Sequence, residues 1–172
     1  MAKKALIAKA QRKPKFQVRG YRDSDTSRCK EIHDLARPIE LKGSCDPRAF
    51  IPLAEDAKDL AEFQRAKKYV AEENKTILGF IGVDEGDIGW LYVDPKNARM
   101  GVGRALLRHA MLRINQDAAD SLASVRDVSV YVLDGNTPAL TLYRSEGFES
   151  ADRFKSKNNG YPCTVLKLSN SF

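Results

Sequence analysis

The hydrophobic and polar residues of this chain follow one another in patterns that predict strands and helices in turn. Apolar runs and alternations predict strands at 16–21, 68–72, 76–83, 88–93, 128–133, 149–155 and 162–168. Apolar residues three and four positions apart predict helices at 24–36, 46–65, 103–116 and 138–146. The first helix should end before Pro38, and the second should be interrupted at Pro52. This order of elements predicts an α/β fold.

One junction between a strand and a helix carries candidate chemistry. An apolar strand ends at Val93, a short polar loop follows, and Gly101 and Gly103 open an amphipathic helix. The first amides of a helix lack intrahelical partners, and the helix dipole places positive charge there. Glycines let a ligand approach the backbone, and Arg99 and Arg104 add donors. The junction therefore predicts a phosphate-binding site.

Two common nucleotide loops fit this junction poorly. A Walker loop needs Lys and then Ser or Thr after its last glycine, whereas this chain has Arg104 and Ala105. A dinucleotide fingerprint needs a third glycine near Leu106 and a tight turn directly after the strand, but eight positions separate Val93 from Gly101. A dinucleotide-binding module is therefore the disfavoured alternative.

A third interpretation of the loop is favoured by its exact order of residues. The sequence runs Val93-x-Pro95, then five residues, then Gly101-x-Gly103, and then Leu106-Leu107. This order resembles the pyrophosphate loop of the GNAT N-acetyltransferase superfamily. One feature departs from the family pattern, because Ala98 stands where the family usually has Arg or Gln.

A second motif follows in the order expected for the same superfamily. A strand ends near Leu133, Asn136 or Thr137 can cap the next helix, and Pro138 suits its first turn. Three and seven residues after Asn136 come Ala139 and Tyr143, and the helix is followed by Gly147-Phe148. This spacing resembles the second segment with which GNAT enzymes contact coenzyme A.

The resemblance implies a GNAT-type mixed, twisted sheet of about seven strands with helices on both faces. The strands at 88–93 and 128–133 should splay apart and admit the pantetheine arm of acetyl-CoA, which is used as a co-substrate without a metal. The residues implied in binding it are the backbone of Leu91, Tyr92 and Val93, the loop Arg99, Met100, Gly101, Val102, Gly103 and Arg104, and the side chain of Asn136.

The resemblance also suggests catalytic residues. Tyr143 aligns with the family's acid for the leaving thiolate, although it could also be a core aromatic residue of an amphipathic helix. Asp87 aligns with the catalytic Glu of the histone-acetylating branch, although it could also only form a hairpin turn. Tyr92, Glu73 and water are further candidates for the base that accepts the proton of the amine.

Charge divides the chain into two parts. Six of its 29 basic residues lie in residues 1–15, which contain no acid, so the remainder has as many basic as acidic residues. We expect 1–15 to be a disordered basic tail and 16–172 to be one N-acetyltransferase domain. The tail is the only part expected to contact nucleic acid.

Other features limit the location and the ligands of the protein. Three scattered cysteines without a Cys-x-x-Cys pair indicate free thiols in a reducing compartment. No apolar run is long enough to cross a membrane, and the two histidines offer no metal-ligand spacing. The sequence thus predicts a cytoplasmic protein with no metal and no membrane partner.

We therefore expect an N-acetyltransferase that moves an acetyl group from acetyl-CoA directly to a primary amine of a small molecule or protein. The alternative is a non-catalytic CoA-binding or nucleic-acid-associated protein with the same fold. By resemblance, segments 37–48 and 154–161 shape the acceptor pocket. Homodimers are common in the family, but the sequence carries no signature of one.

Overall fold

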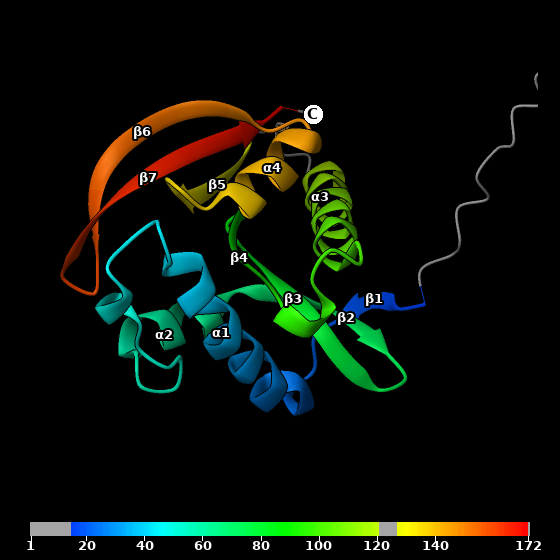
Figure 1. Cartoon of the computed structure of the whole chain (residues 1–172). Helices are drawn as coiled ribbons and strands as arrows, with labels where there is room; N and C mark the ends of the chain where they lie inside the picture. The colour runs from blue at the N-terminus through cyan, green and yellow to red at the C-terminus, as the bar shows by residue number, and fades with distance from the viewer. Residues whose placement is uncertain (1–14, 121–126, 172) are drawn as a thin grey trace, which may run out of the picture.

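The computed structural model describes residues 15–120 and 127–171, so residues 1–14 of the predicted tail lie outside it. Within the described residues the strands are β1 Gln17–Gly20, β2 Lys67–Glu73, β3 Thr76–Asp84, β4 Asp87–Val93, β5 Val128–Leu133, β6 Glu149–Asn158 and β7 Tyr161–Asn170. They form one sheet in the order β1-β2-β3-β4-β5-β7-β6 (Figure 1). The pair β4 and β5 is parallel and the other pairs are antiparallel. The predicted mixed sheet of about seven strands is confirmed.

Helices cover both faces of this sheet, as predicted. The described helices are α1 Thr26–Leu41, α2 Ala57–Arg65, α3 Val102–Asp120 and α4 Thr137–Ser145, with short 3-10 helices η1 Asp23–Asp25, η2 Pro47–Ala49 and η3 Pro95–Asn97. Consecutive residues of β3 point to opposite faces. Ile81 packs in a cluster with α3 and α4, whereas Phe80 packs in a second cluster with α1 and α2. The interruption predicted at Pro52 is confirmed, because it lies between η2 and α2.

The prediction that the first helix ends before Pro38 is wrong, because α1 continues to Leu41. Proline inside a helix costs about 3 kcal/mol, since it lacks an N–H donor and crowds the preceding turn. Leu41 is fully buried, and burial of a leucine contributes about 1.5–3 kcal/mol. The Lys42 amide also donates to the Pro38 carbonyl at 3.2 Å and closes the last turn. Together these contacts offset the proline, and the extra turn carries Glu40.

The hairpin of β6 and β7 reaches across to the segment between α1 and α2 (Figure 1). At its tip, the Asn159 side-chain amide donates to the Ala49 carbonyl at 2.8 Å and to the Asp56 carboxylate at 3.1 Å. The Arg48 guanidinium lies over the Tyr161 ring, 5.1 Å from its centroid. The two segments predicted to shape the acceptor pocket are therefore joined to each other.

The loop after α1 also touches the loop between β5 and α4. Gly135 has a φ of +109°, and a Cβ there would lie 2.6 Å from the Gly43 carbonyl oxygen. That distance is too short for any side chain, so a glycine is needed for the two loops to meet. This contact fixes the position of the helix that carries Tyr143.

We expect Gly135→Ala to lower the free energy of unfolding by about 2–4 kcal/mol, because left-handed backbone strain and overpacking act together. Gly160→Ala is the matched control, since Gly160 has a φ of +85° but no atom within 4 Å of the added Cβ. The control should lose only about 1–2 kcal/mol. Urea unfolding of both variants measures the difference, and equal losses would contradict the close contact.

Candidate functional site

Strands β4 and β5 separate after one pair of residues. Within the part of the chain that the structure describes, their parallel ladder has a single register pair, Ile88 with Val130. Each strand stays paired on its other edge, β4 with β3 as far as Val93 and β5 with β7 as far as Leu133. The splay that the resemblance implies is therefore present. From Gly89 onward, the β4 backbone that faces β5 has no strand partner.

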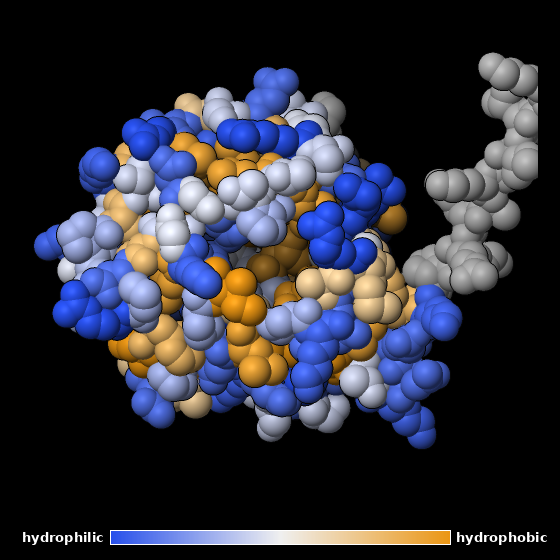
Figure 2. Space-filling view, in the orientation of Figure 1, coloured by the Kyte–Doolittle hydropathy of each residue, from blue (hydrophilic) through white to orange (hydrophobic). Residues whose placement is uncertain are grey.

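Figure 2 shows a hollow in the middle of this face of the molecule, with apolar surface around it. It lies where Figure 1 draws the second half of β4 between α1, α3 and α4. Leu91, Tyr92 and Val93 form that half of the strand. Leu91 and Val93 pack against the cluster of α3 and α4, whereas Tyr92 packs against the cluster of α1 and α2. Both layers of the protein thus meet at the open edge.

The first turn of α3 has free backbone donors beside this edge. The Ala105 amide donates to the Gly101 carbonyl at 3.0 Å. Within residues 15–120 and 127–171, the amides of 102–104 make no hydrogen bond to the preceding loop or to a side chain. A Cβ at Gly103 would lie 3.6 Å from Val93 Cγ2, so this turn adjoins the end of β4. Free amides at a helix N-terminus favour an anion.

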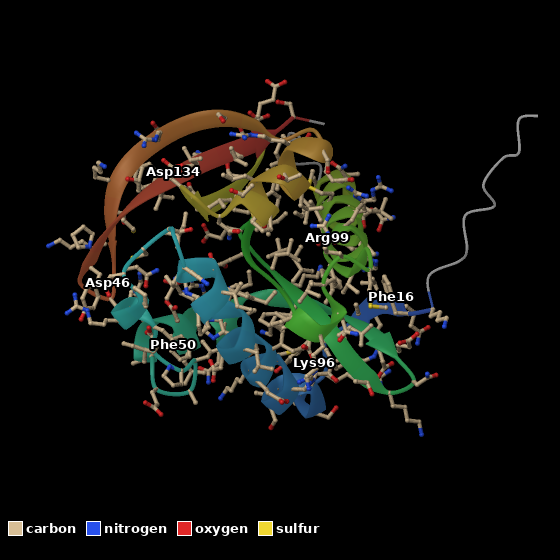
Figure 3. All side chains as sticks on the ribbon, viewed as in Figure 1. Phe16, Asp46, Phe50, Lys96, Arg99 and Asp134 are labelled. Atoms are coloured by element: carbon tan, nitrogen blue, oxygen red, sulfur yellow. The ribbon has the colours of Figure 1, made fainter. Side chains whose placement is uncertain are left out.

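The predicted arginine donors differ in their surroundings. Arg99 is exposed and has a φ of +62°, and Figure 3 labels it in the loop that leads into α3. The neighbouring Met100 is exposed as well. Arg104 Nε instead lies 2.9 Å from the Glu146 carboxylate, which also accepts two hydrogen bonds from Arg108. Arg104 therefore links α3 to α4.

Helix α4 presents two of the predicted residues to the splayed strands. The Asn136 side chain accepts a hydrogen bond from the Ala139 amide at 3.3 Å and caps the helix. Tyr143 is buried, with its ring 5.5 Å from that of Phe148. Burial and the negative charge of Glu40 raise the pKa of Tyr143, so its hydroxyl keeps its proton at neutral pH. Glu40 belongs to α1, so its effect on Tyr143 acts across the opening.

The other predicted acid–base residues lie farther from the open edge. Asp87 begins β4, beside the paired residue Ile88, and its carboxylate accepts a hydrogen bond from the Ser129 amide at 3.0 Å. Glu73 ends β2 and lines a separate shallow groove with Thr76. The charge of Glu40 acts on both Tyr92 and Tyr143, whereas Glu73 lies in the separate groove.

A cluster of polar side chains lies between α1 and β4. Glu40 Oε2 accepts hydrogen bonds from Arg37 Nη1 at 2.6 Å and from the Tyr92 hydroxyl at 2.9 Å. The side chains of Arg37 and Glu40 are 13% and 19% exposed, so water screens the pair only partly. Desolvation and the Glu40 carboxylate raise the pKa of Tyr92.

Sequence reasoning assigned Arg37 and Glu40 to the acceptor segment without giving either of them a role. A spacing of three residues on one helix is a signal for an ion pair. The signal was lost because the predicted helix ended before Pro38. The contact of Arg37 and Glu40 with Tyr92 depends on how α1 packs against β4, which the sequence does not show.

Residues 15–120 and 127–171 contain neither a metal-ligating cluster nor a helix that could span a membrane. No group of three or more His, Cys, Asp or Glu side chains there could hold a metal ion. No described helix is long and apolar enough to cross a membrane.

Comparison with known proteins identifies the fold and its relatives. Residues 64–150, just over half of the chain, match the family described as Acetyltransferase (GNAT) domain. The peptidyl-lysine N-acetyltransferase YiaC of Escherichia coli is 30% identical over 106 residues, which are 61% of this chain and 62% of that protein. The UPF0157 protein YqkA of Bacillus subtilis is 32% identical over 109 residues, but the match spans only 29% of its length.

A second kind of relative matches a short segment. The small ribosomal subunit protein uS14B of Streptomyces coelicolor is 56% identical to this chain over 45 residues. The segment is 26% of this chain and 70% of that protein. One part of this chain therefore has a relative that is not an acetyltransferase.

Solved structures agree on the architecture. A GCN5-related N-acetyltransferase from Rhodopseudomonas palustris superposes with a TM-score of 0.74 at 18% identity, covering 91% of this chain and 95% of that one. The PaiA N-acetyltransferase of Thermoplasma acidophilum, in complex with coenzyme A, has a TM-score of 0.71 at 16% identity and covers 91% and 99%. The ribosomal-protein-alanine N-acetyltransferase of Brucella melitensis has a TM-score of 0.67 at 18% identity and covers 91% and 99%.

The raised pKa of Tyr143 gives a prediction about alkaline stability. An unfolded tyrosine loses its proton near pH 10, whereas the buried Tyr143 keeps it. Its contribution to stability is fully present below about pH 10 and is lost as the pH rises through the folded pKa, with a slope of up to about 1.4 kcal/mol per pH unit. Tyr143→Phe should reduce this slope in denaturant unfolding at alkaline pH. An unchanged slope would mean that Tyr143 titrates normally.

Proposed function

The chain belongs to the GNAT acetyltransferase family, and we propose that it transfers an acetyl group from acetyl-CoA to a primary amine of a protein or peptide. The observation that carries the proposal is the opening between β4 and β5 after the single pair Ile88 and Val130. This opening ends at a helix N-terminus with free amides. A long ligand with amides along its arm and a diphosphate at one end fits both features.

The β4 backbone supports the binding of the pantetheine arm. Along Leu91, Tyr92 and Val93, the N–H and C=O groups on the edge that faces β5 have no strand partner and can pair with amides of an extended ligand as an added strand would. Gly101, Val102 and Gly103 offer the diphosphate backbone donors, and exposed Arg99 offers it positive charge. Asn136 caps α4 near the same opening.

The transfer step needs few special groups. The lone pair of a neutral amine attacks the thioester carbonyl carbon, the carbon–sulfur bond breaks, and the sulfur leaves as a thiolate. A tyrosine hydroxyl carries its proton at neutral pH, so Tyr143, buried on α4 beside the opening, can protonate that thiolate. The product nitrogen then loses its surplus proton to a base or to water. Most of the acceleration comes from holding the two substrates together.

Asp87 stays the predicted base, and its surroundings make the role testable. Its carboxylate already accepts a hydrogen bond from the Ser129 amide, at the end of β4 and β5 where the two strands are still paired. A proton from the amine would have to reach it through water along β4. A general base contributes about 10²–10⁴-fold to the rate, which sets the loss to look for in Asp87→Asn.

The acceptor class is supported by the relatives. YiaC is a peptidyl-lysine N-acetyltransferase, and the Brucella melitensis neighbour is a ribosomal-protein-alanine N-acetyltransferase. Both act on amines of proteins or peptides. The matched region covers only about three fifths of YiaC, so its substrate is a guide for the first assays.

A non-catalytic CoA-binding protein is the rival within the same family. It would bind acetyl-CoA without releasing coenzyme A when amines are supplied. Thiol release with acetyl-CoA and a panel of peptides, followed by peptide mass, separates the two functions.

The uS14-like segment supports a second proposal, that the chain associates with the small ribosomal subunit. Six basic residues in 1–15 provide the charge for contact with a polyanion. The two proposals are compatible, since a bound enzyme would lie near amines of ribosomal proteins.

Co-sedimentation with purified small subunits tests the association. We expect the full chain to sediment with them at low salt and to dissociate as salt rises. A chain lacking residues 1–15 should stay in the supernatant while it still binds acetyl-CoA. Sedimentation that is indifferent to both salt and the deletion would refute the proposal.

Gly103→Glu tests the diphosphate site. The added Cβ would lie 3.4 Å from Leu142, which is ordinary contact, so the fold should tolerate it. The carboxylate would repel the diphosphate, and we expect acetyl-CoA affinity to fall at least about 100-fold, or about 2.7 kcal/mol. Gln116→Glu adds the same charge to an exposed position of α3 and should bind normally. Calorimetric titration decides, and unchanged affinity of the Gly103 variant would contradict the site.

A further inference from the structure

One carboxylate at the opening has an unused oxygen. Glu40 Oε2 receives the hydrogen bonds of Arg37 and Tyr92. Within residues 15–120 and 127–171, no donor is bonded to Glu40 Oε1. Arg37 and Tyr92 fix the orientation of the carboxylate, so the second oxygen is held in place for a further donor.

This oxygen belongs to the acceptor side of the opening. Tyr92, which holds Glu40, lies between the two β4 residues that pack toward α3 and α4. The charge of Glu40 acts on buried Tyr143 across the splayed strands. Glu40 lies in the last turn of α1, and its hydrogen bond from Tyr92 of β4 places it on the α1 side of the opening, where the thioester would end.

The surroundings of Glu40 carry more negative than positive charge. Arg37 balances Glu40, but it also acts on the Asp59 carboxylate of α2, whose pKa is raised by burial and by Asp56. Lys58 also acts on Asp59, and these five side chains together still carry one net negative charge when the three carboxylates are ionised. Net negative charge around Glu40 favours the binding of a cation over that of a neutral ligand.

We propose that Glu40 is the acceptor-recognition residue, with its Oε1 binding the ammonium group of a lysine side chain or a protein N-terminus before transfer. This inference rests on the proposed function and names the acceptor that the same site selects, a cationic primary amine. Glu40 holds and orients the amine. It is a weak base compared with an amine, since the usual pKa of a glutamate lies about six units below that of a lysine and about three and a half units below that of a protein N-terminus, so the proton leaves by another group or by water.

The main experiment compares two glutamates of one helix. Glu40→Gln keeps the size and the hydrogen bonds but removes the charge, and it should raise the KM for lysine peptides by about 10- to 100-fold, as expected for one charge-assisted hydrogen bond. The kcat and the KM for acetyl-CoA should change little. Glu31→Gln is the matched control, because Glu31 forms the same i,i+3 pair with Arg28 at 2.8 Å away from the opening.

A second acceptor separates recognition from a structural role. A peptide with an aminooxy group in place of the lysine amine is a nucleophile without charge at neutral pH. Its KM should be the same for Glu40→Gln and the unaltered protein, whereas a distorted site would slow both acceptors. Asp87→Asn, assayed in parallel, should lower kcat rather than raise KM if Asp87 is the base.

The outcomes distinguish the two levels of the proposal. If the unaltered protein acetylates lysine peptides and Glu40→Gln has the same KM, the role of Glu40 is refuted while the function stands. If the unaltered protein binds acetyl-CoA but neither acetylates nor binds peptides with a lysine or a free N-terminus, both are refuted. Peptide binding in the presence of coenzyme A, measured by calorimetry, supplies the readout that does not depend on turnover.

Discussion

The parallel pairing of β4 and β5 stops after Ile88 and Val130, and the arrangement of the candidate site depends on this early end. Backbone groups left open inside a protein are costly unless something pairs with them. The strands can separate here because β3 and β7 hold their outer edges and because helices pack over both faces. The neighbouring strands and helices therefore hold β4 and β5 apart. A ligand that carries amides can supply the hydrogen-bond partners that the two strands lack.

Three elements distant in sequence converge on that opening with different chemistry. Helix α3 brings backbone donors, α4 brings a protonated tyrosine, and α1 brings an oriented carboxylate. The hairpin tip holds the α1 end of the site, since Asn159 bonds to the segment that follows α1. In the proposed reaction, the diphosphate of the cofactor would meet backbone amides and the ammonium group of the acceptor would meet a carboxylate.

The sequence predicted what local patterns determine. Glycine spacing and apolar periodicity predicted the glycine loop at the start of α3 and the helix faces, because backbone geometry and helix faces leave direct traces in a sequence. The end of α1 was mispredicted, because burial of Leu41 overrides the local effect of Pro38. The partners of Arg104, Asp87 and Glu40 were not predicted, because each contact joins residues far apart along the chain and depends on how the elements pack.

The two arginines on Glu146 have a consequence for anion binding. Arg108 alone reaches both oxygens of that carboxylate, so Glu146 stays fully bonded if Arg104 turns away. Releasing Arg104 breaks an ion pair whose arginine is half exposed and a hydrogen bond from Arg104 Nη2 to Ser145 Oγ at 3.2 Å, which together cost on the order of 1–2 kcal/mol. Arg104 can therefore move from Glu146 to a bound diphosphate at a low energetic cost, because Arg108 continues to neutralise Glu146.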